Sequence, residues 1–399
     1  MHGLSRTKPL LLRSVVKSFR SAVAALVLAG LLTACGGSNS TAGGSTGSTG
    51  GSTTGGTTTG GTTSGGTTTG GTTTGGNTTG GSTTGSTTGG TPPGDPLSII
   101  NPVDGYQTTD EPINHALVSD GANLIRVAEG TTATSMELTV GNRTRRYVVL
   151  KRINSPANAP VLLLFHPSGT SPETMSNVTI VADYVLTQGF WAVLPEAIAG
   201  SWQDDPGNAA NEDVPFVSAL IDTLIANGGV DATRFYAAGF SSGGFMTERL
   251  ACELSDKIAA FGIDSATLRG SQVQVCFPAK QRAKVYFLGN NDLIVPYNGS
   301  VFSNSDNGLR SADATLDFWA QQQQCSGTTT SSLPNLTVDG TNVDLTVYGN
   351  CAAGTRLELY TIKGGGHAWP GGESTIFGVT SRDISATGLI WRFVSGYRR

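Results

Sequence analysis

Ser241 lies at the centre of residues 239–243, which read Gly-Phe-Ser-Ser-Gly. An apolar run at 235–238 precedes this pentapeptide, and a helix-like pattern with Met246 and Leu250 follows it at once. Strand, sharp turn and helix would present the serine hydroxyl at the apex, beside the positive end of the helix dipole, where a nucleophile is both exposed and activated. The pentapeptide arises by chance in a chain with 55 glycines, so its meaning depends on its partners.

A serine becomes a good nucleophile when a histidine takes its proton and a carboxylate fixes that histidine. Beyond the N-terminal segments the histidines are His115, His166 and His367, and His367 alone follows Ser241 in the sequence. Asp292 follows a strand-like run and completes the order Ser, Asp, His. Asp264 also follows a strand and is the rival carboxylate. We favour Asp292, whose longer loop is stiffened by the Val-Pro pair at 295–296.

Ester chemistry also needs two N–H donors for the developing oxyanion. The first expected donor is the backbone of Ser242, directly after the nucleophile. The second should come from the loop after the strand at 161–165, where Pro167 has no N–H. We therefore predict Ser168 as the second donor, with Thr170 as the alternative.

Strand-like and helix-like segments alternate through this part of the chain. The strand-like runs cover residues 145–150, 161–165, 190–194, 235–238, 259–263, 285–288 and 357–362, and the helix-like stretches cover 172–186, 211–226, 244–254, 312–323 and 383–397. Several strands are apolar throughout, which is typical of strands covered on both faces. The pattern predicts an α/β fold with a mostly parallel, doubly wound sheet, whose strand ends carry the functional residues.

Residues 1–35 are expected to direct export. A basic segment is followed by the apolar stretch 22–32 and by Leu-Thr-Ala-Cys at 32–35, and the apolar stretch is short for a membrane span. The last four residues resemble a bacterial lipobox, which predicts lipidation of Cys35. The alternative is an ordinary secretory signal that ends near a cysteine. Because Gly36 stands where an inner-membrane retention signal usually carries Asp, the resemblance implies an outer-membrane or extracellular location.

Residues 36–94 form a Gly/Thr/Ser-rich segment without the apolar side chains needed for a core, so a disordered linker is expected. Residues 95–399 are long enough for one α/β domain. The formal net charge is −4, and no basic run follows the export segment. Nucleic acid is therefore an unexpected partner, and a monomer that acts without a cofactor or metal is predicted.

The domain has four cysteines, an even number that suits an oxidising compartment. Three pairings are possible, and we favour Cys252 with Cys276 and Cys325 with Cys351. Metal binding is the rival interpretation, but no Cys-x-x-Cys spacing occurs and no histidine lies near these cysteines in the sequence.

Three segments, 230–252, 289–299 and 364–372, resemble the polyhydroxybutyrate depolymerase and feruloyl esterase group of α/β-hydrolases. Trp202 with the acidic run up to residue 213 and the four domain cysteines resemble that group too. The resemblance covers most of residues 161–372 and implies an α/β-hydrolase sheet and a serine carboxylesterase mechanism. Members of the group usually have His-Gly where this chain has His166 and Pro167, a difference that bears on the second oxyanion donor.

Two tryptophans are candidates for binding the substrate. Trp369 lies two residues after His367, and Trp202 precedes the acidic run. The alternative for both is a packing role. Residues 97–140 match no part of the family pattern and are expected to add a β-rich edge.

The leading functional hypothesis is an exported, lipid-anchored serine esterase that forms an acyl-enzyme. One alternative is a surface binding module on an inactive hydrolase scaffold, since a fold alone does not establish activity. Another is a peptidase or lipase that uses the same triad. The ester substrate itself is not determined by any residue that we can name.

Overall fold

The computed structural model describes residues 113–119, 123–206, 211–300, 308–373 and 377–399. The predicted export segment, the predicted lipidation site at Cys35 and the predicted linker at 36–94 lie outside these residues. Among the described helices, none has the length and apolar character that a membrane crossing requires.

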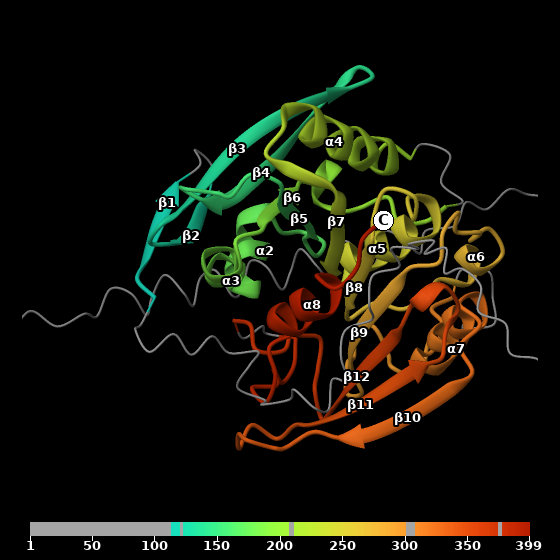
Figure 1. The fold of residues 1–399 in the computed structure, drawn as a ribbon. Coiled ribbons are helices and arrows are strands. Elements are labelled where there is room, and N and C mark those ends of the chain that lie inside the picture. The colour runs from blue at the N-terminus through green and yellow to red at the C-terminus, as the bar shows by residue number, and fades with distance from the viewer. Residues whose placement is uncertain (1–112, 120–122, 207–210, 301–307, 374–376) are drawn as a thin grey trace, which may run out of the picture. The chain divides into compact units, whose positions relative to one another are not determined.

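A ten-stranded mixed sheet forms the centre of the described domain (Figure 1). Its strands run in the order β10-β11-β12-β9-β8-β7-β5-β6-β4-β3. The six from β12 to β6 are parallel, and an antiparallel pair extends each edge. The bounds are β3 (Thr131–Val140), β4 (Arg143–Arg152), β5 (Ala159–Phe165), β6 (Trp191–Pro195), β7 (Val230–Phe240), β8 (Ala260–Asp264), β9 (Ala283–Gly289), β10 (Gly327–Ser332), β11 (Asn342–Gly349) and β12 (Leu357–Lys363).

The edges of the sheet differ from the sequence prediction. Strand β10 was not expected, because it is rich in Thr and Ser and largely exposed, so it lacks the apolar pattern of a buried strand. Strand β11 was not expected either, although its residues 343–347 alternate apolar and polar side chains, as in a half-buried strand. Within the predicted β-rich edge, β3 joins the central sheet, whereas β1 (His115–Ser119) and β2 (Leu124–Ala128) form a separate hairpin. All seven strands predicted from apolar runs are present.

Helices cover both faces of the sheet (Figure 1). Side chains of α4, α5 and α7 pack into one apolar core, and those of α2, α3 and α8 pack into the other. The prediction of a doubly wound α/β-hydrolase sheet is therefore confirmed. The bounds are α2 (Pro172–Thr179), α3 (Val181–Gln188), α4 (Asp213–Asn227), α5 (Ser242–Glu253), α6 (Gly270–Val273), α7 (Ala312–Gln322) and α8 (Ala386–Val394).

The helix predicted at 172–186 is two helices. Ile180 separates α2 from α3 with a left-handed backbone (φ 55°), a conformation that interrupts the regular helix and that a β-branched residue rarely adopts. At the start of α2, Ser171 accepts a hydrogen bond from the N–H of Thr174, and Pro172 occupies the first turn. The sequence thus predicted the start of α2 at residue 172, but it did not predict the break at Ile180.

Both disulfides of the favoured pairing are present. Cys252, in the last turn of α5, bonds Cys276 beyond α6. Cys325, after α7, bonds Cys351, after β11. The first bond ties down the helix that follows Ser241, and the second ties α7 to the antiparallel edge.

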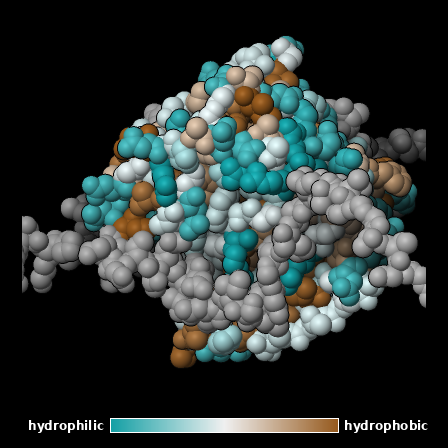
Figure 2. All heavy atoms as spheres, viewed as in Figure 1, coloured by the Kyte–Doolittle hydropathy of each residue, from teal (hydrophilic) through white to brown (hydrophobic). Residues whose placement is uncertain are grey.

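The described surface is of mixed polarity on the face in view. Figure 2 shows hydrophilic and hydrophobic residues intermixed over that face, with no broad brown area among the coloured residues.

Candidate active site

Ser241 sits on a sharp turn between β7 and α5. Its backbone is in an unusual conformation (φ 56°, ψ −120°), which costs free energy of order 1–3 kcal/mol and persists where the surrounding structure imposes it. The N–H of Ser241 donates to the Asp264 carbonyl oxygen at 3.0 Å, and its carbonyl oxygen accepts from the N–H of Phe245. The residue is partly exposed. This is the geometry expected of a nucleophile elbow.

The glycines around the turn are required by close backbone approach. A Cβ at Gly239 would lie 2.1 Å from the Gly243 carbonyl oxygen. A Cβ at Gly243 would lie 2.1 Å from the carbonyl oxygen of Phe165 at the end of β5. The start of α5 is thus pressed against the loop that follows β5, which is where the second oxyanion donor was expected.

His367 and Asp292 are in direct contact. The His367 Nδ1 atom lies 2.7 Å from Asp292 Oδ2, and both side chains are buried. The other carboxylate oxygen, Oδ1, accepts hydrogen bonds from the N–H groups of Ile294 and Val295 at 2.8 and 2.9 Å. With one oxygen held by the backbone, the carboxylate is oriented toward the imidazole and can fix its tautomer.

The loops that carry these residues meet beside the elbow. The N–H of Asn291 donates to the Gly365 carbonyl oxygen at 2.9 Å, which joins the loop after β9 to the loop after β12. The ring of Phe240, the residue directly before Ser241, lies 5.1 Å from the His367 ring between centroids. Ser241, Asp292 and His367 therefore occupy the same edge of the sheet, at the carboxyl ends of three parallel strands.

Asp264, the rival carboxylate, lies at the end of β8 and is completely buried. Among the described residues, neither of its carboxylate oxygens has a hydrogen-bond partner. Burial raises the pKa of Asp264 well above its usual value, and the nearby charge of Asp292 raises it further. Burial disfavours a negative charge on Asp264, although the Ser265 side chain opposes the rise in its pKa, whereas Asp292 contacts the histidine directly.

The predicted oxyanion loop faces the start of α5. The Ser168 hydroxyl lies 2.9 Å from the Ser201 hydroxyl. The N–H of Gly169 is occupied by the Gly200 carbonyl oxygen. Among the described residues, the N–H of Ser168 has no hydrogen-bond partner, and the first N–H groups of a helix such as α5 lack intrahelical partners. The N–H groups of Ser168 and Ser242 are thus available. The Thr170 hydroxyl donates to the Pro167 carbonyl oxygen, which leaves the N–H of Thr170 as the alternative donor.

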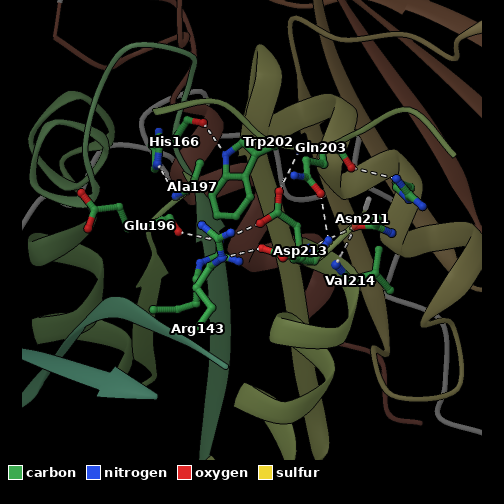
Figure 3. Close-up of polar contacts among 12 residues, drawn as sticks. Arg143, His166, Glu196, Ala197, Trp202, Gln203, Asn211, Asp213 and Val214 are labelled. Carbon is green, nitrogen blue, oxygen red and sulfur yellow. Dashed lines mark hydrogen bonds and ion pairs between the residues drawn. The ribbon is translucent and has the colours of Figure 1, made fainter. Parts of the chain in front are cut away.

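His166 and Trp202 hold this loop in place (Figure 3). The His166 Nε2 atom accepts the N–H of Ala197 at 3.0 Å, and its Nδ1 atom lies 2.9 Å from the Pro167 carbonyl oxygen. Burial lowers the pKa of His166, so the neutral imidazole, with its proton on Nδ1, serves both contacts. The Trp202 indole N–H donates to the His166 carbonyl oxygen at 2.9 Å. The sequence analysis placed His166 in the His-Gly position of the family pattern but gave its side chain no role, because its contact with Ala197 joins two segments that are distant in the sequence.

Both candidate substrate tryptophans are core residues. Trp202 is 4% exposed and Trp369 is 1% exposed. The Trp369 indole N–H donates to the Thr387 hydroxyl, and its ring packs edge-on against Phe240. The packing alternative therefore accounts for both rings. Trp369 packs against Phe240, which precedes Ser241, and Trp202 binds the loop after β5.

The acidic segment after Trp202 is anchored by charge (Figure 3). Asp213 is buried, binds Arg145 at 2.6 Å and accepts the N–H of Gln203 at 2.7 Å. Arg249, on α5, donates to the carbonyl oxygens of Gln203 and Asp205. The segment is thereby tied to the helix that follows Ser241.

A buried polar cluster lies under the same helix. Glu248, on α5, accepts hydrogen bonds from the Tyr286 hydroxyl at 2.6 Å and from the Trp319 indole N–H at 3.0 Å. The ammonium of Lys284, on β9, lies 3.6 Å from the centre of the Trp319 ring. Burial raises the pKa of Glu248 and lowers that of Lys284, and the attraction between the two charges opposes both shifts. The cluster fixes α5 against the sheet about two helical turns from Ser241.

Within the ranges that the structure describes, no group of three or more His, Cys, Asp or Glu side chains is arranged to hold a metal ion. The polar groups at the strand ends are instead those of nucleophilic acyl transfer: a hydroxyl, an imidazole bound to a carboxylate, and backbone N–H donors.

No family model matches the chain. Feruloyl esterase B of Piromyces equi is 31% identical over 219 residues, covering 53% of this chain and 40% of that enzyme. A protein named for esterase activity, NocK of Nocardia uniformis subsp. tsuyamanensis, is 28% identical, covering 68% of this chain and 84% of its own length. The bifunctional acetylxylan esterase/xylanase XynS20E of Neocallimastix patriciarum is 26% identical, covering 61% and 32%. The match thus spans less than half of the Piromyces and Neocallimastix proteins.

These relatives share the reaction class in their names, and the sheet topology with its elbow at Ser241 is that of an α/β-hydrolase. The chain is therefore an α/β-hydrolase-fold relative of the feruloyl esterases.

Proposed function

We propose that this protein is a serine carboxylesterase that works through an acyl-enzyme. The observation that carries the proposal is the 2.7 Å contact between His367 Nδ1 and Asp292 Oδ2, on two loops beside the elbow of Ser241. A buried carboxylate on one imidazole nitrogen leaves the other nitrogen to act as a base.

In the first half of the reaction, the Ser241 hydroxyl attacks the ester carbonyl while His367 Nε2 takes its proton. Asp292 stabilises the imidazolium that forms. The N–H groups of Ser242 and Ser168 donate to the oxyanion, and the loop contacts of His166 and Trp202 hold Ser168 in place. His367 then protonates the leaving alcohol, which leaves an acyl ester on Ser241.

In the second half, water replaces the alcohol. His367 takes a proton from the water as it attacks the acyl carbonyl, and the same two N–H groups stabilise the second oxyanion. Return of the proton to Ser241 releases the carboxylic acid and restores the enzyme. No step requires a cofactor.

For the substrate, we propose feruloyl or acetyl esters of polysaccharides. The support is the naming of relatives as feruloyl esterases and as an acetylxylan esterase. Hydroxyalkanoate oligomers, which the family resemblance also suggests, are the comparison substrate. Hydrolysis rates on methyl ferulate, acetylated xylan and hydroxybutyrate oligomers distinguish the three classes of ester substrate. Hydrolysis of nitroanilides with the same acyl groups tests for peptidase activity.

For location, we propose export with a lipid anchor at Cys35. Two disulfides in the domain favour an oxidising compartment. The lipobox-like residues 32–35 and the polar linker at 36–94 suit a folded domain held away from a membrane surface.

Replacing Ser241 with alanine tests the reaction itself. Because the acyl-enzyme cannot form, we expect kcat for nitrophenyl acetate to fall by about 10⁴-fold or more, with loss of fluorophosphonate labelling. Ser395→Ala, at an exposed position after α8, is the matched control and should keep both. An active, labelled Ser241→Ala protein would exclude this mechanism, and an inactive, unlabelled wild-type protein would favour a binding module.

A further inference from the structure

The ring of Phe240 is stacked on the ring of His367. Phe240 is the last residue of β7 and directly precedes Ser241. The two ring centroids are 5.1 Å apart, and the ring planes are inclined by only 31°. Aromatic rings at this distance and at a small angle are offset-stacked, so the imidazole lies over the face of the phenyl ring and not beside its edge.

Water is largely excluded from the stacked rings, because Phe240 and His367 are each 4% exposed. In the esterase reaction, His367 takes a proton from Ser241 and later from water, so a positive charge forms on a buried imidazole. Burial opposes such a charge unless neighbouring groups stabilise it. Asp292 contacts the imidazole at its Nδ1 edge, whereas Phe240 covers a face of the ring.

The face of a phenyl ring carries partial negative charge. A cation within about 6 Å of the ring centroid is attracted to that face, most strongly where water is excluded. The Phe240 ring meets both conditions. The attraction is stronger for an imidazolium than for a neutral imidazole, so it is larger in the transition state than in the ground state. A difference of this kind raises kcat and leaves KM nearly unchanged.

A second phenyl ring near His367 has a different role. The centroid of the Phe377 ring lies 6.4 Å from that of His367, and the two planes are inclined by 79°. This distance is beyond the range of about 6 Å for a cation over a ring face. The backbone of Phe377 holds the histidine instead, because its carbonyl oxygen accepts the N–H of His367 at 3.2 Å. The charge on the imidazole is therefore met by Phe240.

Trp369 fixes the orientation of the Phe240 ring. The Trp369 ring packs edge-on against it, with centroids 6.2 Å apart and an interplanar angle of 74°. The indole N–H donates to the Thr387 hydroxyl at 2.9 Å, and that hydroxyl donates to the Thr179 carbonyl oxygen at 2.6 Å. Trp369 is thereby anchored to α8 and to the end of α2. Contacts from both rings keep the face of Phe240 on His367.

We propose that Phe240 is a positioning residue for the esterase reaction: its ring face orients His367 and stabilises the imidazolium in both halves of the reaction, and Trp369 holds the ring in place. The inference rests on the proposed function and deepens it. It gives the residue before the nucleophile an electrostatic role that its apolar side chain does not suggest.

The test replaces Phe240, in the full-length protein, with phenylalanines that carry one, two and three ring fluorines. Fluorine withdraws electron density from the ring face and nearly keeps the shape and packing of the ring. We expect kcat for nitrophenyl acetate to fall with each fluorine, by about tenfold in the trifluoro variant, with KM nearly unchanged. The rate constant of fluorophosphonate labelling, which needs the same proton transfer from Ser241, should fall in the same order.

Phe190 provides the matched control, because it is buried and stacked on Trp391 with centroids 4.1 Å apart. The same fluorines at Phe190 should leave kcat unchanged. Phe240→Leu, which excludes water without a ring face, should lower kcat by about tenfold, and Phe240→Tyr should keep it within a few fold.

The outcomes separate this inference from the proposal on which it rests. Equal kcat values across the Phe240 fluorine series would overturn the inference and leave the esterase proposal intact. A wild-type protein that hydrolyses no ester would overturn both.

Discussion

At the residue scale, two aspartates at the ends of neighbouring strands occupy opposite environments. Asp292 has one oxygen on His367 and the other on two backbone N–H groups. Asp264 is fully buried, and its carboxylate oxygens have no hydrogen-bond partner among the described residues. The first environment stabilises a charge and the second disfavours one, so only Asp292 is suited to act as the acid of a triad.

Asp292→Asn tests this assignment. The amide cannot hold the imidazole in the productive tautomer, so we expect kcat for nitrophenyl acetate to fall by about 10⁴-fold. Asp264→Asn, which keeps shape without charge, should change kcat at neutral pH by no more than a few fold. Steady-state kinetics on both variants show which aspartate is the carboxylate of the triad. A comparable loss of kcat in Asp264→Asn would assign that role to Asp264.

The pKa of Asp264 predicts a pH-dependent stability. Because burial raises the pKa in the folded state, the folded protein retains a proton that the unfolded chain releases above about pH 4. The free energy of unfolding therefore falls as pH rises from about 4 toward the raised pKa. Each unit of raised pKa corresponds to about 1.4 kcal/mol.

Asp264→Asn should remove this dependence. The variant should match the wild type near pH 4 and be more stable at neutral pH, as measured by denaturant unfolding at several pH values. Asp222→Asn, at an exposed surface ion pair, is the control. A stability difference that does not grow with pH would contradict the raised pKa.

At the element scale, the elbow depends on contact between α5 and the end of β5. Gly243 is the point of contact, because a Cβ there would lie 2.1 Å from the Phe165 carbonyl oxygen. The same approach brings the start of α5 to the loop with Ser168. Displacement of α5 would therefore disturb the nucleophile and the oxyanion donors together.

Gly243→Ala should thus lower both stability and activity. We expect a loss of stability of about 1–3 kcal/mol, as for overpacked core positions, and a fall in kcat that exceeds any change in KM. Thermal unfolding and kinetics on the soluble variant measure the two effects. Gly349→Ala, with no heavy atom within 4 Å of the added Cβ, is the control, and equal behaviour of the two variants would contradict this role of Gly243.

At the scale of the whole molecule, we propose a division of the sequence into an export segment, a polar linker and an α/β domain. The proposed anchor is a single residue, Cys35, and the triad residues all belong to the described domain. Attachment and catalysis should therefore be separable by mutation.

Cys35→Ser should release the protein from the membrane fraction while leaving kcat/KM on a soluble ester unchanged, because the lipid chain supplies the attachment. Cell fractionation and fatty-acid labelling measure the first effect, and Gly36→Ala, which keeps the cysteine, is the control. If Cys35→Ser stays in the membrane fraction, the anchor lies elsewhere.

The α/β fold was predictable because buried parallel strands are apolar throughout and alternate with helices. Two features of the fold were not predicted, because they depend on contacts between segments and not on a local apolar pattern. The Thr-rich β10 is held by pairing with β11, and the break at Ile180 is a single left-handed residue between α2 and α3. Neither leaves an apolar period in the sequence.

The sequence by itself determined the residue types and their order: a serine between glycines, a later aspartate, one late histidine and four cysteines. Tertiary structure alone decided which atoms meet. It placed Asp292, and not Asp264, on His367, and it buried Trp202 and Trp369 in the core. The reason is that local patterns encode the elements, whereas burial and contact depend on how distant elements pack.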